Sequence, residues 1–302
     1  MRLSYMLSEF STKLIRKDCT KNSKVAEVPA VALNAPKIIS RYGDGTREEN
    51  RSSGDRSDYL MEYKYTKRIL DRYIATGSTV LEIGCGTGYY GRYLADKCSH
   101  YTGVDITPGN IDVFNKKVAE LGLSNVKGFT GDAINLEEIA DDSFDVVLNF
   151  GPLYHLPPAE RELVFKESKR VCKSQGIVMF AYINKIGVYL GRCLNEPEKY
   201  PNRQKNVSIL KKGMDDTRED IYWFAMPEEM EDAAVRNGLI VVENLGVDFV
   251  FVPQMHESAE ENKESWEELS DFLCASESCA GFSNHAVMVC KKAQCFGENY
   301  QY

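Results

Sequence analysis

The stretch from Val80 to Gly88, which reads VLEIGCGTG, constrains the fold more than any other part of the chain. Four residues of strand character run directly into three glycines at alternate positions, and an amphipathic segment follows from Tyr89 to Lys97. Glycines suit such a turn because it needs unusual backbone dihedrals, and because a ligand can approach a backbone that carries no Cβ. The pattern predicts a buried strand, a tight turn and a helix start, with a ligand crevice at the carboxyl end of the strand.

An acid, one apolar residue and a Gly-x-Gly-x-Gly run resemble the first motif of class I S-adenosylmethionine-dependent methyltransferases. Glu82, Gly84, Gly86 and Gly88 match that motif position by position. The hexapeptide that begins at Gly86 also satisfies the dinucleotide pattern G-x-G-x-x-G. That pattern wants its first glycine directly after the strand, and counting from Gly84 puts Tyr89 where the third glycine belongs. The methyltransferase resemblance is therefore favoured over a nicotinamide oxidoreductase and over a glycine turn without a ligand.

Acids follow the next two predicted strands. Asp105 ends the strand 101–105, 21 residues beyond Gly84, and a carboxylate there can accept both hydroxyls of a ribose. Asp132 follows the strand 126–129, where the family places an acid that binds the adenine amino group. The resemblance implies a site for S-adenosylmethionine, released as S-adenosylhomocysteine, formed by Glu82, Gly84, Cys85, Gly86, Gly88, Asp105, Ile106, Asp132, Ala133 and Asn149.

The loop 150–156, after the fourth predicted strand, reads FGPLYHL and resembles a loop of a bacterial subgroup of small-molecule methyltransferases. His155 is the best general-base candidate because the pKa of an unperturbed imidazole lies near physiological pH. The alternative is that His155 only orders the loop or caps the next helix. Tyr154 is the second catalytic candidate, and we expect Tyr154, His155 and Trp223 to contact the substrate.

The remaining apolar patterns complete an α/β fold. Helices are expected at 57–74, 108–121, 159–172 and 227–237, and further strands at 144–149, 176–182, 239–243 and 285–290. The apolar face of the second helix consists of Ile111, Phe114, Val118 and Leu121. By resemblance, the fold is a Rossmann-like, seven-stranded, mostly parallel sheet with helices on both faces. The last strand is expected antiparallel, between the fifth and the sixth.

Two long segments interrupt this pattern. Residues 183–226 are expected to form an inserted substrate cap, since a loop that long inside a compact fold usually has a function or a structure of its own. Residues 253–284 form an acidic helical insertion, with a solvated face favoured over a binding surface. The expected domains are thus an N-terminal extension and lid (1–57), a methyltransferase domain (58–290) and a C-terminal tail (291–302).

Charge and cysteine usage limit the partners. Lys and Arg number 37 against 45 Asp and Glu, a net charge of −8, which disfavours nucleic acid as the main partner. The sequence contains no run of 18 apolar residues, so no membrane span is predicted. The nine scattered cysteines have no usual zinc spacing, so neither a disulfide framework nor a metal is expected. We expect a cytoplasmic monomer or homodimer.

The predicted function is methyl transfer from S-adenosylmethionine to O, N or S of a small molecule. The sulfonium is already activated, so catalysis needs mainly in-line positioning and exclusion of water. One alternative is an RNA or protein methyltransferase, for which no basic groove or recruitment domain is visible. Another is a non-catalytic scaffold that binds the cofactor. Loss of the ribose-binding or adenine-binding acid would indicate such a scaffold, and both acids are present.

Overall fold

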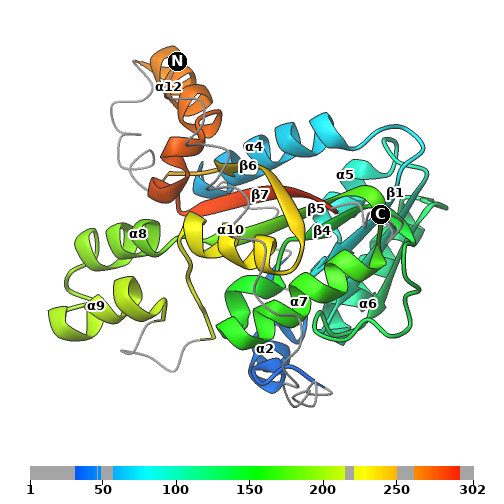
Figure 1. Ribbon diagram of the computed structural model, residues 1–302, viewed down its shortest axis with the longest axis horizontal. Coiled ribbons are helices and arrows are strands. Elements are labelled where there is room, and N and C mark those ends of the chain that lie inside the picture. Colours follow the sequence, from blue (N-terminus) through cyan, green and yellow to red (C-terminus); the bar gives the residue numbers. More distant parts are fainter. Residues whose placement is uncertain (1–30, 46, 49–56, 215–220, 250–261, 293–302) are drawn as a thin grey trace, which may run out of the picture. The chain divides into compact units, whose positions relative to one another are not determined.

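The computed structural model describes residues 31–45, 47–48, 57–214, 221–249 and 262–292. Within them, one seven-stranded sheet consists of β1 (Thr79–Ile83), β2 (His100–Asp105), β3 (Val126–Thr130), β4 (Phe144–Asn149), β5 (Cys172–Ile183), β6 (Leu239–Gly246) and β7 (His285–Lys292). The strand order is β3-β2-β1-β4-β5-β7-β6 (Figure 1). β7 runs antiparallel to its neighbours β5 and β6, whereas the other neighbouring pairs are parallel. The expected fold class is confirmed, including the place of the antiparallel strand.

The sheet is buried on both faces, because successive side chains of a strand point to opposite sides. In β1, Leu81 and Ile83 pack into the core on one face, while Val80 packs into the core on the other. The same alternation appears in β5, where Phe180 and Met179 belong to different cores. Such near-continuous apolar strands are typical of a mostly parallel sheet that helices cover on both sides.

Helices cover both faces of the sheet. On one face lie α7 (Pro158–Val171) and α10 (Pro227–Arg236), which stand in front of the sheet in Figure 1. On the other lie α4 (Ser57–Tyr73), α5 (Tyr89–Leu94) and α6 (Pro108–Glu120). A shorter helix, α2 (Ala35–Tyr42), precedes them in the chain and contacts α6.

One residue predicted for the core is on the surface. The apolar spacing of the helix 108–121 places Leu121 on its buried face, but the side chain of Leu121 is 59% exposed. The other three residues of that face are buried, as predicted. α6 ends at Glu120, and Gly122 takes a left-handed conformation with φ 65°, so the chain turns before Leu121 can face the sheet.

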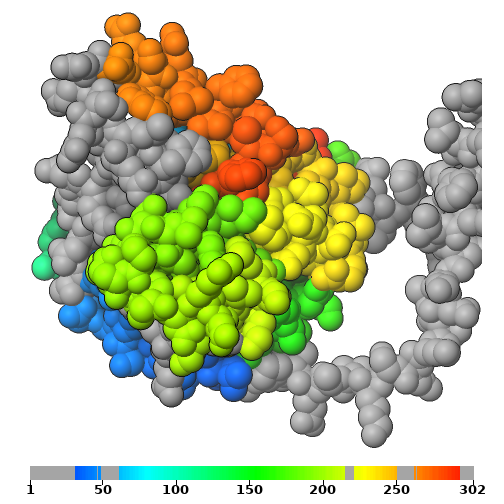
Figure 2. Space-filling model, turned by 90° about the vertical axis from the view of Figure 1, so that its left-hand side faces the viewer, coloured from blue at the N-terminus to red at the C-terminus, as the bar shows by residue number. Residues whose placement is uncertain are grey.

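The segment between β5 and α10 has a structure of its own. It contains α8 (Lys185–Val188), η2 (Tyr189–Leu194) and α9 (Arg203–Lys212) around a small apolar cluster. An ion pair of 2.5 Å between Lys185 and Glu229 ties its start to α10. In Figure 2 this segment forms the green surface that faces the viewer. The insertion at 183–226 is therefore a folded helical unit in its described part.

The second insertion contains the predicted helix. Its described part is α12 (Lys263–Cys274), followed by the short 3-10 helix η4 (Glu277–Phe282). Leu273 packs against the core, whereas Phe272 is 69% exposed. The expectations for residues 1–30, 253–261 and 293–302 lie outside the described residues. Of the helices that the structure describes, none is long and apolar enough to cross a membrane.

Candidate cofactor and acceptor site

A cleft opens at the carboxyl ends of the central strands. Its volume is about 1170 Å³, counted with the open solvent at its mouth. The loops after β1, β2, β3 and β4 line it, together with Tyr42 of α2, Tyr63 of α4 and the first residues of β7. The loop after β4 contains the short 3-10 helix η1 (Pro152–His155). In an open α/β sheet this edge, next to a strand where the order reverses, is where ligands bind.

The glycine turn after β1 lines the cleft as predicted from the sequence. Gly84 has φ 80° and Gly86 has φ 53°, conformations that residues with a Cβ rarely adopt. A Cβ at Gly84 would also lie 2.6 Å from Cδ of Pro152, so this turn packs directly on the loop after β4. Gly84, Cys85 and Gly86 lie in the described lining, whereas Gly88 caps α5 and packs against an aromatic ring.

Asp105 connects the end of β2 with this turn. Its Oδ2 accepts a hydrogen bond of 2.9 Å from the backbone N–H of Gly86, and its Oδ1 accepts one of 2.8 Å from Thr107. Burial raises the pKa of the Asp105 carboxyl, while these hydrogen bonds and one from Asn110 oppose the rise. The carboxylate is held in place at the cleft wall, with one oxygen directed to the glycine turn.

One buried polar atom beside Asp105 has no hydrogen-bond partner within the described structure. It is Oδ1 of Asn110, a residue that lines the cleft. Because a buried acceptor without a partner costs about 1–3 kcal/mol, such an atom is suited to a ligand that donates a hydrogen bond. A hydroxyl or amino group of a nucleoside would satisfy it, so the residues present fit the predicted cofactor.

Asp132 follows β3 and lines the same cleft with Ala133 and Ile106. Its Oδ2 accepts a hydrogen bond of 2.7 Å from the backbone N–H of Ala32, and its Oδ1 accepts one of 3.2 Å from Ile134. The segment before α2 therefore reaches the acid that the resemblance assigns to adenine. A carboxylate oxygen has two lone pairs, so these bonds leave acceptor capacity for an amino group.

Glu82 lies inside the end of β1 and is 2% exposed. Its carboxyl group accepts a hydrogen bond from the hydroxyl of Tyr101. Burial raises the pKa of Glu82 well above its usual value, and the neighbouring Asp105 adds to the rise. Burial thus favours the neutral form of Glu82, next to an Asp105 whose hydrogen bonds oppose the same effect of burial.

Aromatic rings surround His155 at the loop after β4. Its Nε2 lies 3.4 Å from the hydroxyl of Tyr42, and its Nδ1 lies 3.4 Å from the carbonyl oxygen of Ile221. The hydroxyl of Tyr42 is in turn 3.0 Å from that of Tyr222. The ring of Tyr154 meets His155 edge-on, with centroids 4.8 Å apart. Burial is the main cause that raises the pKa of Tyr42, so this phenol stays protonated.

Two residues predicted for the site are near it without lining it. Trp223 is not among the described residues that line the cleft. Its backbone N–H donates to the carbonyl oxygen of Tyr154 at 2.8 Å. The aromatic ring beside His155 is that of the neighbouring Tyr222. Asn149 is fully buried at the end of β4, where its Nδ2 donates to Ser168 at 3.3 Å.

Sequence reasoning missed several residues that line the cleft. Tyr42 comes from a segment that the sequence presents as an extension, and Glu62 lies on a helix with no motif. His285 starts β7, far along the chain from every motif. A histidine where an apolar strand begins was the one available signal, because β7 was expected beside β5.

Comparison with known proteins agrees with this site. Residues 80–176 match the family model of a methyltransferase domain. The ubiquinone biosynthesis O-methyltransferase of Bartonella bacilliformis is 26% identical over 175 residues, which are 57% of this chain and 64% of the relative. The chain thus matches less than two thirds of that relative's length.

Two solved structures have the same fold. The cyclase SpnF has a TM-score of 0.58 at 18% identity, covering 87% of this chain and 97% of its own. Magnesium protoporphyrin IX methyltransferase from Synechocystis PCC 6803, solved with bound S-adenosylhomocysteine, has a TM-score of 0.55 at 12% identity. It covers 86% of this chain and 100% of its own.

Fold, motif order and family match agree. The fold is that of class I S-adenosylmethionine-dependent methyltransferases, and the residues that match the methyltransferase domain, 80–176, span β1 to the early part of β5. The resemblance drawn from the glycine turn and the two acids is confirmed.

Proposed function

We propose that the chain transfers a methyl group from S-adenosylmethionine to a nucleophilic O, N or S atom of a small molecule. The observation that carries the proposal is Asp105, fixed at the cleft wall next to the unpartnered buried Oδ1 of Asn110. When bound, the cofactor supplies a methyl group that is already activated on a sulfonium. The chain then has to bind and orient both substrates and exclude water.

The residue roles follow the cleft. Asp105 would accept the ribose hydroxyls, and Asp132 with Ala133 and Ile106 would hold the adenine. The turn 84–86 allows close approach of the cofactor, with Glu82 neutral behind it. Gly88 and Asn149 would act by supporting the turn and the end of β4, because neither belongs to the described lining.

Tyr154 and His155 would bind the acceptor. The contacts of His155 favour the ordering role over the base: Nδ1–H can donate to Ile221 while Nε2 accepts from Tyr42. Trp223 would contribute through its backbone bond to Tyr154. The insertion 183–226 would cover the acceptor, and residues 31–48 would act as a lid over the cofactor.

The charge of the cleft narrows the acceptor class. Its described lining contains no Lys or Arg, but several carboxyl groups, those of Glu48, Glu62, Glu82, Asp105 and Asp132. An acceptor with a carboxylate or phosphate would meet like charge there, so we propose a neutral or cationic acceptor. The same charge argues against RNA as the acceptor. We keep a monomer or homodimer in the cytoplasm as the expected state.

Isothermal titration with S-adenosylhomocysteine tests the cofactor. We expect micromolar binding by the wild type and none of NAD. Asp105→Asn should weaken binding about 10- to 100-fold, because hydrogen bonds to a charged acceptor contribute about 1.5–3 kcal/mol each. The matched control is Asp112→Asn on the exposed side of α6, which should bind like the wild type. Equal binding by Asp105→Asn, or binding of NAD alone, would contradict the proposal.

A further inference from the structure

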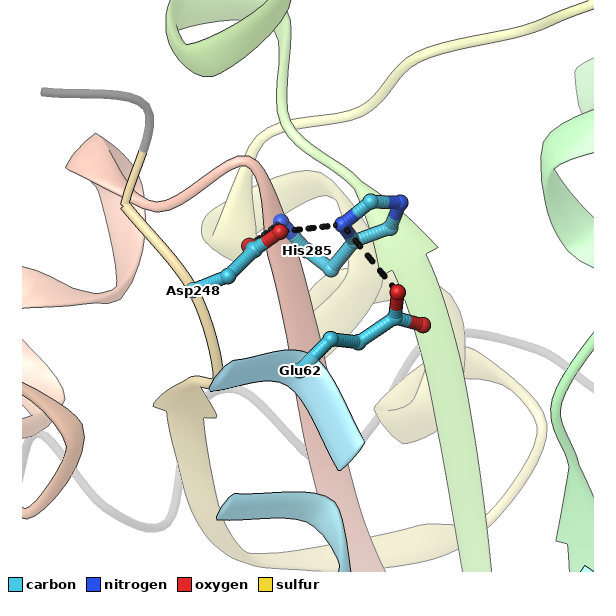
Figure 3. A group of neighbouring side chains, drawn as sticks. All are labelled: Glu62, Asp248 and His285. Atoms are coloured by element: carbon cyan, nitrogen blue, oxygen red, sulfur yellow. Dashed lines mark hydrogen bonds and ion pairs between the residues drawn. The ribbon is translucent and has the colours of Figure 1, made fainter. Parts of the chain in front are cut away.

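A cluster of three titratable side chains lies at the cleft, apart from the motif residues. It consists of Glu62 of α4, Asp248 just after β6 and His285 at the start of β7 (Figure 3). Nδ1 of His285 lies 2.6 Å from Oδ2 of Asp248 and 3.9 Å from Oε2 of Glu62. Glu62 and His285 line the cleft, and Asp248 is behind them with a side chain 6% exposed.

Asp248 fixes the orientation of His285 by two bonds. Its Oδ1 accepts from the backbone N–H of His285 at 2.5 Å, and its Oδ2 faces Nδ1 of the same residue. Nδ1 also lies 3.1 Å from Nδ2 of Asn284, but its contact with Asp248 is shorter. Because a carboxylate can only accept, that shorter contact favours the tautomer in which Nδ1 carries the hydrogen and donates it. In the neutral imidazole the lone pair is then on Nε2. Among the described residues, the hydrogen bonds of the Asp248 side chain go to His285, which explains why this carboxylate is buried.

The working nitrogen is on the side of the ring opposite the carboxylates. Figure 3 shows Nε2 directed away from both Asp248 and Glu62, on a residue that lines the cleft. Glu62 and Asp248 are the charged groups that face the ring from the packed elements α4 and β6. Both would stabilise the positive charge that His285 gains when Nε2 takes a proton. The arrangement is that of an activated nucleophile: an acceptor group donates its proton to a base, Nε2 of His285, and a third group, Asp248, orients the base.

We propose that His285, positioned by Asp248, is the general base of the methyl transfer. The inference rests on the proposed function and deepens it: the acceptor atom is one that carries a hydrogen, in a hydroxyl, a thiol, or an ammonium group that gives its proton to the base before it attacks. The acceptor atom forms its bond to the methyl carbon, and the carbon–sulfur bond breaks with its electron pair going to sulfur. The hydrogen leaves the acceptor as a proton for Nε2 and then passes to water.

A metal is the competing reading of the same three groups. Two ligands about 2.1 Å from one ion lie roughly 3 Å or more apart. The 2.6 Å between Nδ1 of His285 and Oδ2 of Asp248 is shorter and has the length of a charge-assisted hydrogen bond. Oδ1 of Asp248 is already bound to the backbone. The geometry therefore fits a shared hydrogen rather than an ion.

Nitrogen-15 NMR of the imidazoles tests the tautomer without any acceptor. The chain has four histidines, so His285 can be assigned by comparison with His285→Gln. We expect neutral His285 to carry its hydrogen on Nδ1, and Asp248→Asn to move this hydrogen toward Nε2. Hydrogen on Nε2 in the wild type would overturn the proposal. A stoichiometric shift of the His285 Nδ1 signal by added Zn²⁺ would also overturn it, in favour of a metal.

Turnover gives the second test, on a panel of catechol, thiophenol and tyramine. His285→Gln should lower kcat about 100-fold or more on the acceptor that is methylated, with binding of S-adenosylhomocysteine unchanged. Exposed His100→Gln is the matched control and should keep the wild-type kcat. A wild-type kcat in His285→Gln would overturn the base. Absence of S-adenosylhomocysteine binding by the wild type would instead contradict the proposed function. If no panel member reacts, the tautomer of His285 seen by NMR decides whether the proposed base stands.

Discussion

The α-carbon of Gly88 faces the ring of Phe114 so closely that a Cβ on Gly88 would lie 2.1 Å from Cδ2 of that ring. Three more glycines surround the same ring: an added Cβ would lie 2.3 Å from it at Gly128, 2.8 Å at Gly103 and 3.2 Å at Gly91. They come from β3, β2 and α5, so one buried phenylalanine of α6 joins the helix after the glycine turn to two strands. The third glycine of the motif therefore serves packing, whereas the first two line the cleft.

Gly88→Ala should destabilise the protein by about 2–5 kcal/mol, from left-handed strain and from overpacking against Phe114. The control is Gly122→Ala, which has a similar positive φ of 65° but no neighbour within 4 Å of the new Cβ. It should cost about 1–2 kcal/mol. Urea unfolding measures both, and equal losses would mean that the ring contact does not matter.

Phe114→Leu provides the coupling test, since it vacates the space that a Cβ on Gly88 would occupy. Alone, this substitution should destabilise by a few kcal/mol through the cavity that it leaves, about 2–4 kcal/mol. Combined with Gly88→Ala, the loss should fall short of the sum of the two single losses by about 1 kcal/mol or more. Strict additivity of the two losses would argue against direct contact.

Three successive residues before α2 donate hydrogen bonds to the loops after β3 and β4 and to the start of α7. Asn34 donates from Nδ2 to the carbonyl oxygen of His155 at 2.9 Å, Leu33 donates to Glu160 at 3.0 Å, and Ala32 donates to Asp132. If this segment is a lid, Asn34→Ala should speed dissociation of S-adenosylhomocysteine about five-fold, because one hydrogen bond contributes about 1 kcal/mol. Displacement kinetics measure this rate.

Lys37→Ala, an exposed change in the helix α2 that follows Asn34, should leave that dissociation rate unchanged. A rate for Asn34→Ala equal to that of the wild type would mean that the segment does not hold the cofactor in place. A parallel rise in both variants would indicate general loosening of α2 instead of loss of one bond.

The site residues that the sequence predicted are those whose positions depend on the order of successive strands along the chain. Glu82 and Asp105 each stand at the end of a strand, and parallel strands that follow one another bring such ends to the same edge of the sheet. Asp132 belongs to the same series. Their contact with one cleft follows from the chain order alone, because no long-range pairing has to be known.

The part that was missed depends on contacts between distant segments. His285 meets Asp248 and Glu62 because β7 enters the sheet between β5 and β6, which gathers three segments that share no motif. The aromatic ring beside His155 belongs to Tyr222, one residue before the predicted Trp223. Side chains of an extended segment alternate, and composition does not say which of two adjacent rings turns toward His155.

Glu82 gives the stability of the cofactor-free protein a pH dependence of known sign. Its carboxyl group has an ordinary pKa near 4.5 and a well-raised one in the folded protein, so the folded state favours the protonated form. The stabilisation that this proton provides is complete below pH 4.5 and is lost as the pH rises toward the folded pKa. The loss proceeds at up to about 1.4 kcal/mol per pH unit.

Glu82→Gln removes this titration while keeping a neutral side chain of similar size next to Tyr101. The variant should therefore gain stability relative to the wild type between pH 5 and pH 7, measured by urea unfolding at each pH without cofactor. Exposed Glu138→Gln is the control and should follow the wild type. Parallel curves for Glu82→Gln and the wild type would mean that Glu82 is ionised in the fold, and a charged pair with Asp105 would then have to be stabilised by other groups.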